Sequence, residues 1–299
     1  MGYQLWTSPK TGYRRRGTRL IDLRYAVGAG IITRTILEPL QCCQSDAPAV
    51  EMNRILEGRG FDTAGVQALK GGPVLGFVLT SELRDGLVKN HLKPLMSNHV
   101  ISEATPLGEL FTVLRGREQA FVIIGSEVRA IVTRADLNKP PVRVYLFGLL
   151  SLLEMHMQFW IHQVYSAESW KQQLKRERLD AADKLQRERR ARNEDITLLD
   201  CLQFCDKRDL LLANELLRKK LGLTSKGKAS SMFKGAEDLR NRLAHSQQDL
   251  VQGSTWEAHI ELVTKVEELV HLSDEAVEQD AKASGTSGDG LWMAAQGAP

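Results

Sequence analysis

Three polar side chains at positions 240–245 have the chemistry to cleave a phosphodiester without a metal ion. Arg240, Asn241 and His245 belong to the stretch Asp-Leu-Arg-Asn-Arg-Leu-Ala-His, which ends at His245. An arginine braces a phosphate through a planar fork of donors and stays charged at any cellular pH. A histidine titrates near neutrality, so His245 could take the proton from a ribose 2′-hydroxyl and return it. Arg240 would then stabilise the charge that develops on the phosphate, and Asn241 would orient the phosphate or the imidazole.

The spacing of these residues constrains the helix that is expected to carry them. At about 3.6 residues per turn, Asn241 and His245 share a face, whereas Arg240 and His245 point well apart. Either the helix ends or distorts here, or a second copy of the motif completes the site. The alternative without chemistry is a solvated helix face.

The string Arg-Asn-Arg-Leu-Ala-His resembles the RNxxAH form of the HEPN family, and the resemblance covers about the last half of the chain. HEPN domains are all-helical and occur in prokaryotic ribonucleases and toxins. The resemblance implies a metal-independent endoribonuclease, toxin-like or active in phage defence, that needs no catalytic cofactor. RNA would be the substrate, and the products would be a 2′,3′-cyclic phosphate and a 5′-hydroxyl. It also implies a homodimer that brings two motifs, each with Arg240, Asn241 and His245, into one cleft.

An internal repeat precedes this helical half. The stretch Pro48-Ala-Val-Glu-Met is echoed by Pro106-Leu-Gly-Glu-Leu, and each copy continues with a helical pattern and two short apolar runs. The runs are rich in valine and isoleucine, which predicts strands. They span residues 63–68, 74–79, 120–124 and 128–133. A repeat of this size predicts two similar units that bury their sheets against each other.

The repeat units resemble CBS domains, which pair and bind adenine nucleotides. The second copy ends in Val-Thr-Arg-Ala-Asp-Leu, and the resemblance assigns Thr133 and Asp136 to ligand contact. An aspartate can accept hydrogen bonds from both hydroxyls of a ribose. In the first copy Glu82 stands at the aspartate position but Leu79 replaces the threonine. We therefore expect one functional site per pair, with AMP, ADP or ATP as regulatory ligand. The alternative for Asp136 is a helix N-terminal residue that only satisfies backbone donors.

Aromatic and basic residues are interleaved in the first 30 positions, and glycines there break any helix. Such a segment could bind phosphates and stack on bases, or it could pack on a neighbouring domain or subunit. The residues concerned are Tyr3, Trp6, Lys10, Tyr13, Arg14, Arg15, Arg16 and Arg19.

The composition and the positions of helix-breaking prolines predict the domain boundaries. The 40 basic and 37 acidic residues nearly cancel, so any polyanion site must be local. The adjacent Pro140 and Pro141 should end the CBS-like module, and everything after them reads as helical. The fold class predicted is α+β: an arm (1–30), a tandem CBS module (31–142), a HEPN-like helical bundle (143–279) and a disordered tail (280–299). Residues 222–231 read as a flexible basic loop before the motif helix.

The cysteines and the apolar segments predict the cellular location of the protein and whether it binds a metal. Four cysteines form neither a disulfide framework nor a zinc spacing, and the chain shows no signal peptide, so we expect a cytoplasmic protein. The longest apolar segment, residues 144–161, is interrupted by Glu154, His156 and Gln158 and reads as a buried helix, so no membrane contact is expected. The function predicted is an endoribonuclease gated by an adenine nucleotide. The rival is a non-catalytic adenylate sensor whose helical half docks onto a partner.

Overall fold

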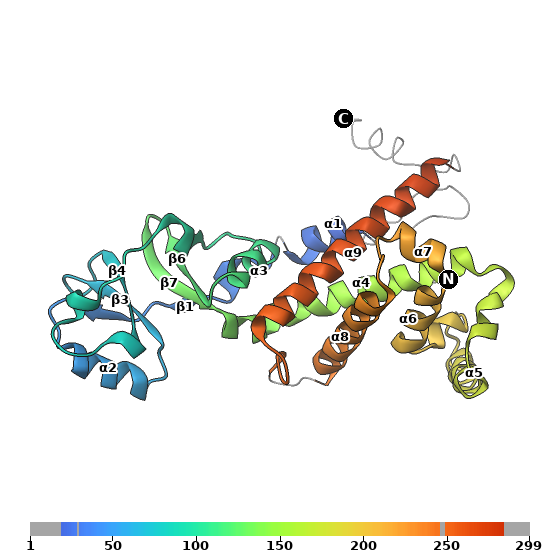
Figure 1. Ribbon diagram of the computed structural model, residues 1–299, viewed down its shortest axis with the longest axis horizontal. Helices are drawn as coiled ribbons and strands as arrows, with labels where there is room; N and C mark the ends of the chain where they lie inside the picture. Colours follow the sequence, from blue (N-terminus) through green and yellow to red (C-terminus); the bar gives the residue numbers. More distant parts are fainter. Residues whose placement is uncertain (1–18, 29, 246–248, 284–299) are drawn as a thin grey trace. The chain divides into compact units, whose positions relative to one another are not determined.

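The computed structural model describes residues 19–28, 30–245 and 249–283 (Figure 1). The chain divides into two compact units: residues 28–142 form one, and residues 1–27 with 143–299 form the other. Positions 1–18 of the predicted arm and the predicted tail from residue 284 lie outside the described residues.

The unit of residues 28–142 contains the repeat as two strand–helix–strand–strand modules. The first consists of β2 (Cys42–Gln44), α2 (Ala49–Gly58), β3 (Thr63–Gln67) and β4 (Val74–Leu79). The second consists of β5 (Val100–Ser102), α3 (Leu107–Arg115), β6 (Gln119–Ile124) and β7 (Glu127–Thr133). In each module the first strand runs parallel to the second, and the last two strands are antiparallel. A short strand, β1 (Glu38–Pro39), extends the second sheet by pairing with β7.

The two modules share a local irregularity as well as a topology. The register shifts between Val66 and Gln67 in the first sheet and between Val122 and Ile123 in the second. Both shifts fall at the same step of the repeat, because Thr63 pairs with Leu79 as Gln119 pairs with Thr133. A bulge shared by two copies is a feature of the unit rather than a defect. The internal repeat read from the sequence is therefore a structural repeat.

Apolar side chains from both sheets meet between the modules. Leu40, Phe77 and Phe121 are buried together there, and the rings of Phe77 and Phe121 lie 4.9 Å apart. One polar contact crosses the same boundary: Oγ1 of Thr63 donates to Oε1 of Gln119 at 2.8 Å. Short 3-10 helices fill the connections of this unit, at Thr33–Thr35, Thr80–Glu82, Val88–His91, Ser97–His99 and Arg134–Asn138.

The other unit is helical. It contains α1 (Leu20–Leu23), α4 (Pro140–Val164), α5 (Arg176–Arg190), α6 (Phe204–Ala213), α7 (Glu215–Lys220), α8 (Lys226–Ala244) and α9 (Trp256–Ala283). Shorter helical turns lie at Arg24–Gly28, Ser166–Gln173 and Leu199–Cys201. In Figure 1 the long helix α9 lies beside α4, and Ser273 of α9 joins both His156 and Trp160 of α4 through side-chain hydrogen bonds of 2.6 Å. Helix α8 packs against α6 and α9.

Helix α4 begins where the sequence suggested a break. Pro140 and Pro141 form its first turn, a position where the missing amide hydrogen costs nothing. Among the described residues, α4 alone is long and apolar enough to cross a membrane, and 61% of its most apolar window is buried within the protein. Core helices have the same composition, so this helix is weak evidence for a membrane span.

The described part of the N-terminal segment, which begins at Arg19, packs on α9. The backbone nitrogen of Leu20 donates to Oδ2 of Asp274 at 2.8 Å, and Arg24 pairs with Glu267 at 2.8 Å. Glu267 also accepts a hydrogen bond from the buried Tyr145 of α4, whose pKa is raised by burial and by the nearby carboxylate. Residues 19–27 are thus fixed to the helical unit.

The mixed α/β class with a tandem β-α-β-β unit followed by helices is confirmed. The assignment of the helices to the HEPN family stays a prediction. The expected loop over residues 222–231 is wrong in its second half, because α8 already starts at Lys226 with Ser225 as its N-cap. Helix α9 continues to Ala283, past the expected start of the tail.

Candidate functional sites

A pocket of about 430 Å³ lies between the two modules of residues 28–142. Each module contributes the two residues at the start of its middle strand. These are Asp62 and Thr63 at the start of β3, and Glu118 and Gln119 at the start of β6. The full lining is Asp62, Thr63, Phe77, Leu79, Ser81, Lys93, His99, Arg117, Glu118, Gln119 and Phe121. Aromatic rings, carboxylates and cations thus face one cavity, a combination that suits a ligand with an apolar body and an anionic group.

Arg117 is the most informative residue of this pocket. Its Nη1 atom is enclosed, and it has no hydrogen-bond partner among the residues that the structure describes. A buried donor of a charged group is costly unless it finds an acceptor. An anion or carbonyl oxygen in the pocket would provide one.

A second cation of the pocket is already paired. Nζ of Lys93 lies 2.7 Å from Oε1 of Glu82, a candidate ligand residue in the first module. Both side chains are partly exposed, so the pair is screened and can exchange partners at small cost. Glu82 is not one of the lining residues, but it contacts Lys93, which is.

Thr133 and Asp136 lie together at the end of β7, but they do not line this pocket. Thr133 donates from its backbone nitrogen and from Oγ1 to Oδ2 of Asp136, at 2.7 and 2.9 Å. Oδ1 of Asp136 lies 2.8 Å from Nζ of Lys139. Burial opposes the charge of Lys139, but its hydrogen bonds to Asp136 and Glu38 raise its pKa. Asp136 is buried and is the third residue of the short helix Arg134–Asn138, where its carboxylate accepts from the backbone nitrogen of the N-cap residue Thr133.

The phosphodiester motif lies at the C-terminal end of α8. Helix α8 ends at Ala244, and His245 follows as the C-cap with φ −91° and ψ 10°. The helix therefore ends at the motif, which is one of the two solutions that the spacing allowed. Arg240, Asn241 and His245 are all exposed. The structure places them on one exposed helix end within a single chain.

Arg240 has an acidic neighbour on another helix. Its Nε atom lies 3.6 Å from Oε2 of Glu154 on α4. The other oxygen of Glu154 lies 2.6 Å from Nζ of Lys207 on α6, and only 1% of the Lys207 side chain is exposed. The contact with Lys207 is a direct hydrogen bond, whereas the contact with Arg240 is a longer ion pair.

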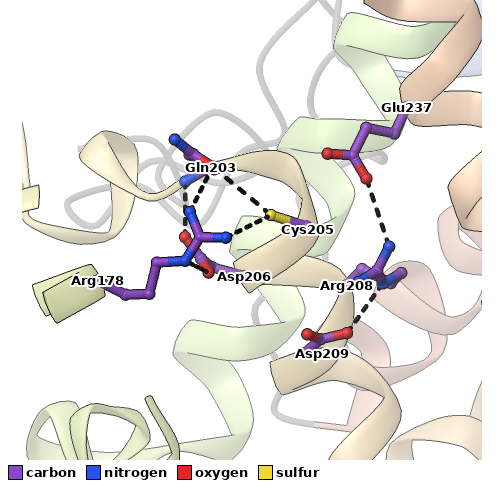
Figure 2. A network of polar contacts seen from close by, with 7 residues as sticks. All are labelled: Arg178, Gln203, Cys205, Asp206, Arg208, Asp209 and Glu237. Atoms are coloured by element: carbon purple, nitrogen blue, oxygen red, sulfur yellow. Dashed lines mark hydrogen bonds and ion pairs between the residues drawn. The ribbon is translucent and has the colours of Figure 1, made fainter. Parts of the chain in front are cut away.

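A second polar connection ties α6 to α8. Arg208 lies between Asp209 and Glu237, with contacts of 2.9 and 3.3 Å, as Figure 2 shows. Glu237 precedes Arg240 by about one helical turn on α8. Figure 2 also shows a separate group of contacts around Arg178 of α5: its Nη1 donates to Oε1 of Gln203 at 2.6 Å, and its Nε lies 3.5 Å from Oδ1 of Asp206.

Several of these residues were outside the reach of sequence reasoning. Arg117 and Lys93 carry no motif, although the repeat could have directed attention to the residues that begin β3 and β6. Glu154 appeared only as an interruption of an apolar segment. A charged residue inside an otherwise apolar helix is itself a signal, because it needs a partner when the helix is buried. Within the described part of the chain, no group of three or more potential metal ligands occurs.

Comparisons with known proteins reach only part of the chain. No protein-family model and no curated protein sequence matches it. Solved structures similar to 37–41% of the chain include an uncharacterized conserved protein from Pyrococcus horikoshii (18% identity, 90% of that chain covered, TM-score 0.33). Two others are the CBS domain of a bacterial CNNM/CorC-family Mg²⁺ transporter in complex with ATP (14%, 93%, 0.33) and a conserved CBS-domain protein of unknown function from Thermoplasma acidophilum (12%, 75%, 0.32).

Proposed function

We propose that residues 28–142 bind an adenine nucleotide in the pocket between the two modules. The observation that carries this proposal is the enclosed, unpartnered Nη1 of Arg117 beside a cavity of about 430 Å³. Ligand pockets typically measure about 300–1,000 Å³. The apolar wall of Phe77, Leu79 and Phe121 suits a base, the carboxylates of Asp62 and Glu118 suit ribose hydroxyls, and Arg117 suits a phosphate.

Calorimetry with AMP, ADP, ATP and adenosine tests this proposal. Arg117→Met keeps the length of the side chain but removes its charge. A charge-assisted hydrogen bond is worth about 1.5–3 kcal/mol, so nucleotide affinity should fall about 10- to 150-fold. Adenosine affinity should not change. The matched control is Arg115→Met, because Arg115 is exposed and does not line the pocket. Unchanged AMP affinity in Arg117→Met would exclude this role.

Thr133 and Asp136 are the second candidate contact for the ribose. The carboxylate of Asp136 would have to give up its bonds from Thr133 or its contact with Lys139 to accept a ribose hydroxyl. Asp136→Asn separates the two sites in the same calorimetric series. A loss in Asp136→Asn with none in Arg117→Met would place the ligand at the end of β7.

For the helical unit we propose metal-independent endoribonuclease activity, gated by the nucleotide. The specific observation in its favour is that Arg240, Asn241 and His245 are all exposed at a helix end. His245 takes the proton from a 2′-hydroxyl, the 2′-oxygen bonds to the adjacent phosphorus, and the bond from phosphorus to the 5′-oxygen breaks as His245 returns the proton to that oxygen. Arg240 stabilises the phosphate charge. RNA is the substrate, and the activity is of the toxin or defence type.

Incubation of the purified protein with total RNA in EDTA, with and without AMP or ATP, tests this activity. A positioned general base contributes about 10²–10⁴-fold, so His245→Ala should leave barely measurable cleavage. His271→Ala is the matched control, because His271 is an exposed histidine on α9. Arg240→Lys keeps the charge but loses the planar fork, and it should impair cleavage strongly. If the protein cuts no RNA under any nucleotide condition, the non-catalytic adenylate sensor is the better account.

A further inference from the structure

The motif arginine belongs to a chain of three charges that connects three helices. Lys207 of α6, Glu154 of α4 and Arg240 of α8 follow one another at 2.6 and 3.6 Å. Their exposed side-chain fractions are 1%, 19% and 44%, so the chain runs from the core to the surface. The three groups carry one net positive charge, and the exposed end of that charge is Arg240.

The position of Lys207 determines how the net positive charge is distributed over the three side chains. A fully buried ammonium group requires a counter-charge, and Glu154 provides it through a direct hydrogen bond. The carboxylate is thereby largely neutralised before it meets Arg240. Its contact with Arg240 is longer and is made at Nε, so it directs the guanidinium without neutralising it. Within the described part of the chain, the ion pair of Arg240 is the one at Nε, so its terminal nitrogens can offer the bidentate geometry that suits a phosphate.

We infer that Glu154, held by Lys207, is a positioning residue that orients Arg240 toward an RNA phosphate. This inference rests on the proposed ribonuclease function and names a residue that the motif does not contain. Without Lys207, Glu154 would be a full negative charge beside Arg240 and would compete with the phosphate. Without both, Arg240 would keep its charge but lose its orientation. The two variants should therefore fail in different ways.

The first measurement compares RNA binding in a His245→Ala background, which does not cleave. A short fluorescent single-stranded RNA is titrated at several salt concentrations. Lys207→Met should weaken binding about tenfold and lower the slope of log K against log salt by about 0.7, the loss of one phosphate contact. Glu154→Gln/Lys207→Met should bind as the background does, because Arg240 is again uncompensated.

The second measurement is the steady-state cleavage of the same RNA with His245 intact. Glu154→Gln/Lys207→Met should lower kcat about tenfold with KM unchanged, because a misplaced group loses transition-state stabilisation. Lys207→Met should raise KM. This division of effects separates positioning from a structural role, which would change only the melting temperature. The double variant also avoids the unpaired buried lysine that Glu154→Gln alone would leave.

Arg208→Met is the matched control for both measurements. It removes the ion pair that joins α6 to Glu237 of α8 (Figure 2) and leaves the Lys207, Glu154 and Arg240 side chains in place. It should lower the melting temperature but leave RNA binding and cleavage as in the wild type.

The outcomes separate this inference from the proposed activity. If the wild type cuts RNA and the Lys207 and Glu154 variants change only in melting temperature, the inference is overturned and the ribonuclease stands. If the wild type binds RNA without cutting it and Lys207→Met still lowers the salt slope, the ribonuclease fails and the positioning of Arg240 stands. If the protein neither binds nor cuts RNA, both are overturned.

Discussion

At the scale of single residues, His259 shows how burial sets the behaviour of a titratable group. It lies in the first turns of α9 with 3% of its surface exposed, and its ring meets that of Trp256 edge-on. Its Nε2 atom has no hydrogen-bond partner among the described residues. Burial, and then the nearby charge of Arg242, lower its pKa to about 4, against an ordinary value of 6.5. His259 is therefore neutral in the folded protein at neutral pH.

This lowered pKa predicts a loss of stability in mild acid. Between pH 6.5 and 4 the unfolded chain binds a proton at His259 that the folded chain does not, so stability is complete above pH 6.5 and falls as the pH drops to 4. The loss amounts to about 3 kcal/mol. Urea unfolding at several pH values should show this slope in the wild type and a smaller one in His259→Gln. Equal slopes in both would mean that His259 does not control the acid sensitivity.

Sequence reasoning at this scale identified residue types but not their partners. Arg240, Asn241 and His245 could be selected because their spacing is local. The roles of Lys207 and Glu154 could not be predicted, because their contact joins residues 53 positions apart. For Asp136 the sequence left two roles open, a ribose contact or a helix N-terminal residue that satisfies backbone donors, and local geometry gives it Thr133 as a partner.

At the scale of elements, β4 contains a glycine that its surroundings require. A Cβ atom on Gly76 would lie 2.3 Å from the carbonyl oxygen of Lys93 and 2.7 Å from Cδ1 of Leu92. The neighbouring Phe77 exchanges backbone hydrogen bonds with Lys93, so this segment cannot retreat freely. The close approach holds Lys93 at the wall of the pocket.

Gly76→Ala should therefore destabilise the protein by about 1–3 kcal/mol, the usual cost of overpacking. It should also weaken nucleotide binding, because Lys93 lines the pocket. Chemical denaturation and calorimetry measure the two effects. Gly108→Ala is the control: this glycine lies in α3 with nothing within 4 Å of the added carbon, so the helix should gain about 0.5–1 kcal/mol. A stable Gly76→Ala protein would show that the Lys93 segment can move.

The sequence predicted strands better than helix ends. Valine-rich runs that recur in two copies define β3, β4, β6 and β7, because both copies must bury the same face. The start of α4 was missed, because a proline pair stops a helix in its interior but fits its first turn. The start of α8 was missed as well, because the polar residues from Lys226 onward show no apolar period until Phe233 packs against Phe204.

At the scale of the whole molecule, we predict a homodimer in which each cleft takes residues from both copies. The reason is the resemblance of the motif to HEPN domains, which implies a two-fold assembly that brings two motifs into one cleft. Light scattering at micromolar concentration should find the dimer. Mixing Arg240→Ala with His245→Ala should restore part of the RNA cleavage that each has lost. A monomer, or a mixture as inactive as its components, would remove the shared cleft.

Helix α4 spans the sequence boundary between the two units, which falls between residues 142 and 143. Helix α4 begins at Pro140, directly after Lys139, which pairs with Asp136 at the end of the second module. The same helix carries Glu154, which pairs with Arg240. We predict that a nucleotide that alters the contact between Asp136 and Lys139 acts on the motif through α4. Coupling between two sites is typically about 1–3 kcal/mol, or 5- to 150-fold.

Val144→Gly tests this route, because Val144 is exposed and lies near the start of α4. A glycine in a helix costs about 1 kcal/mol relative to alanine, so it loosens the connection without removing a core contact. The quantity measured is the ratio of the RNA cleavage rates with and without AMP. In Val144→Gly this ratio should come closer to one, by a factor of up to about five. In Val144→Ala it should equal the wild-type ratio. AMP binding, measured by calorimetry, reports that the nucleotide site is intact in both. The same ratio in both variants would mean that the nucleotide acts on the motif by a route other than α4.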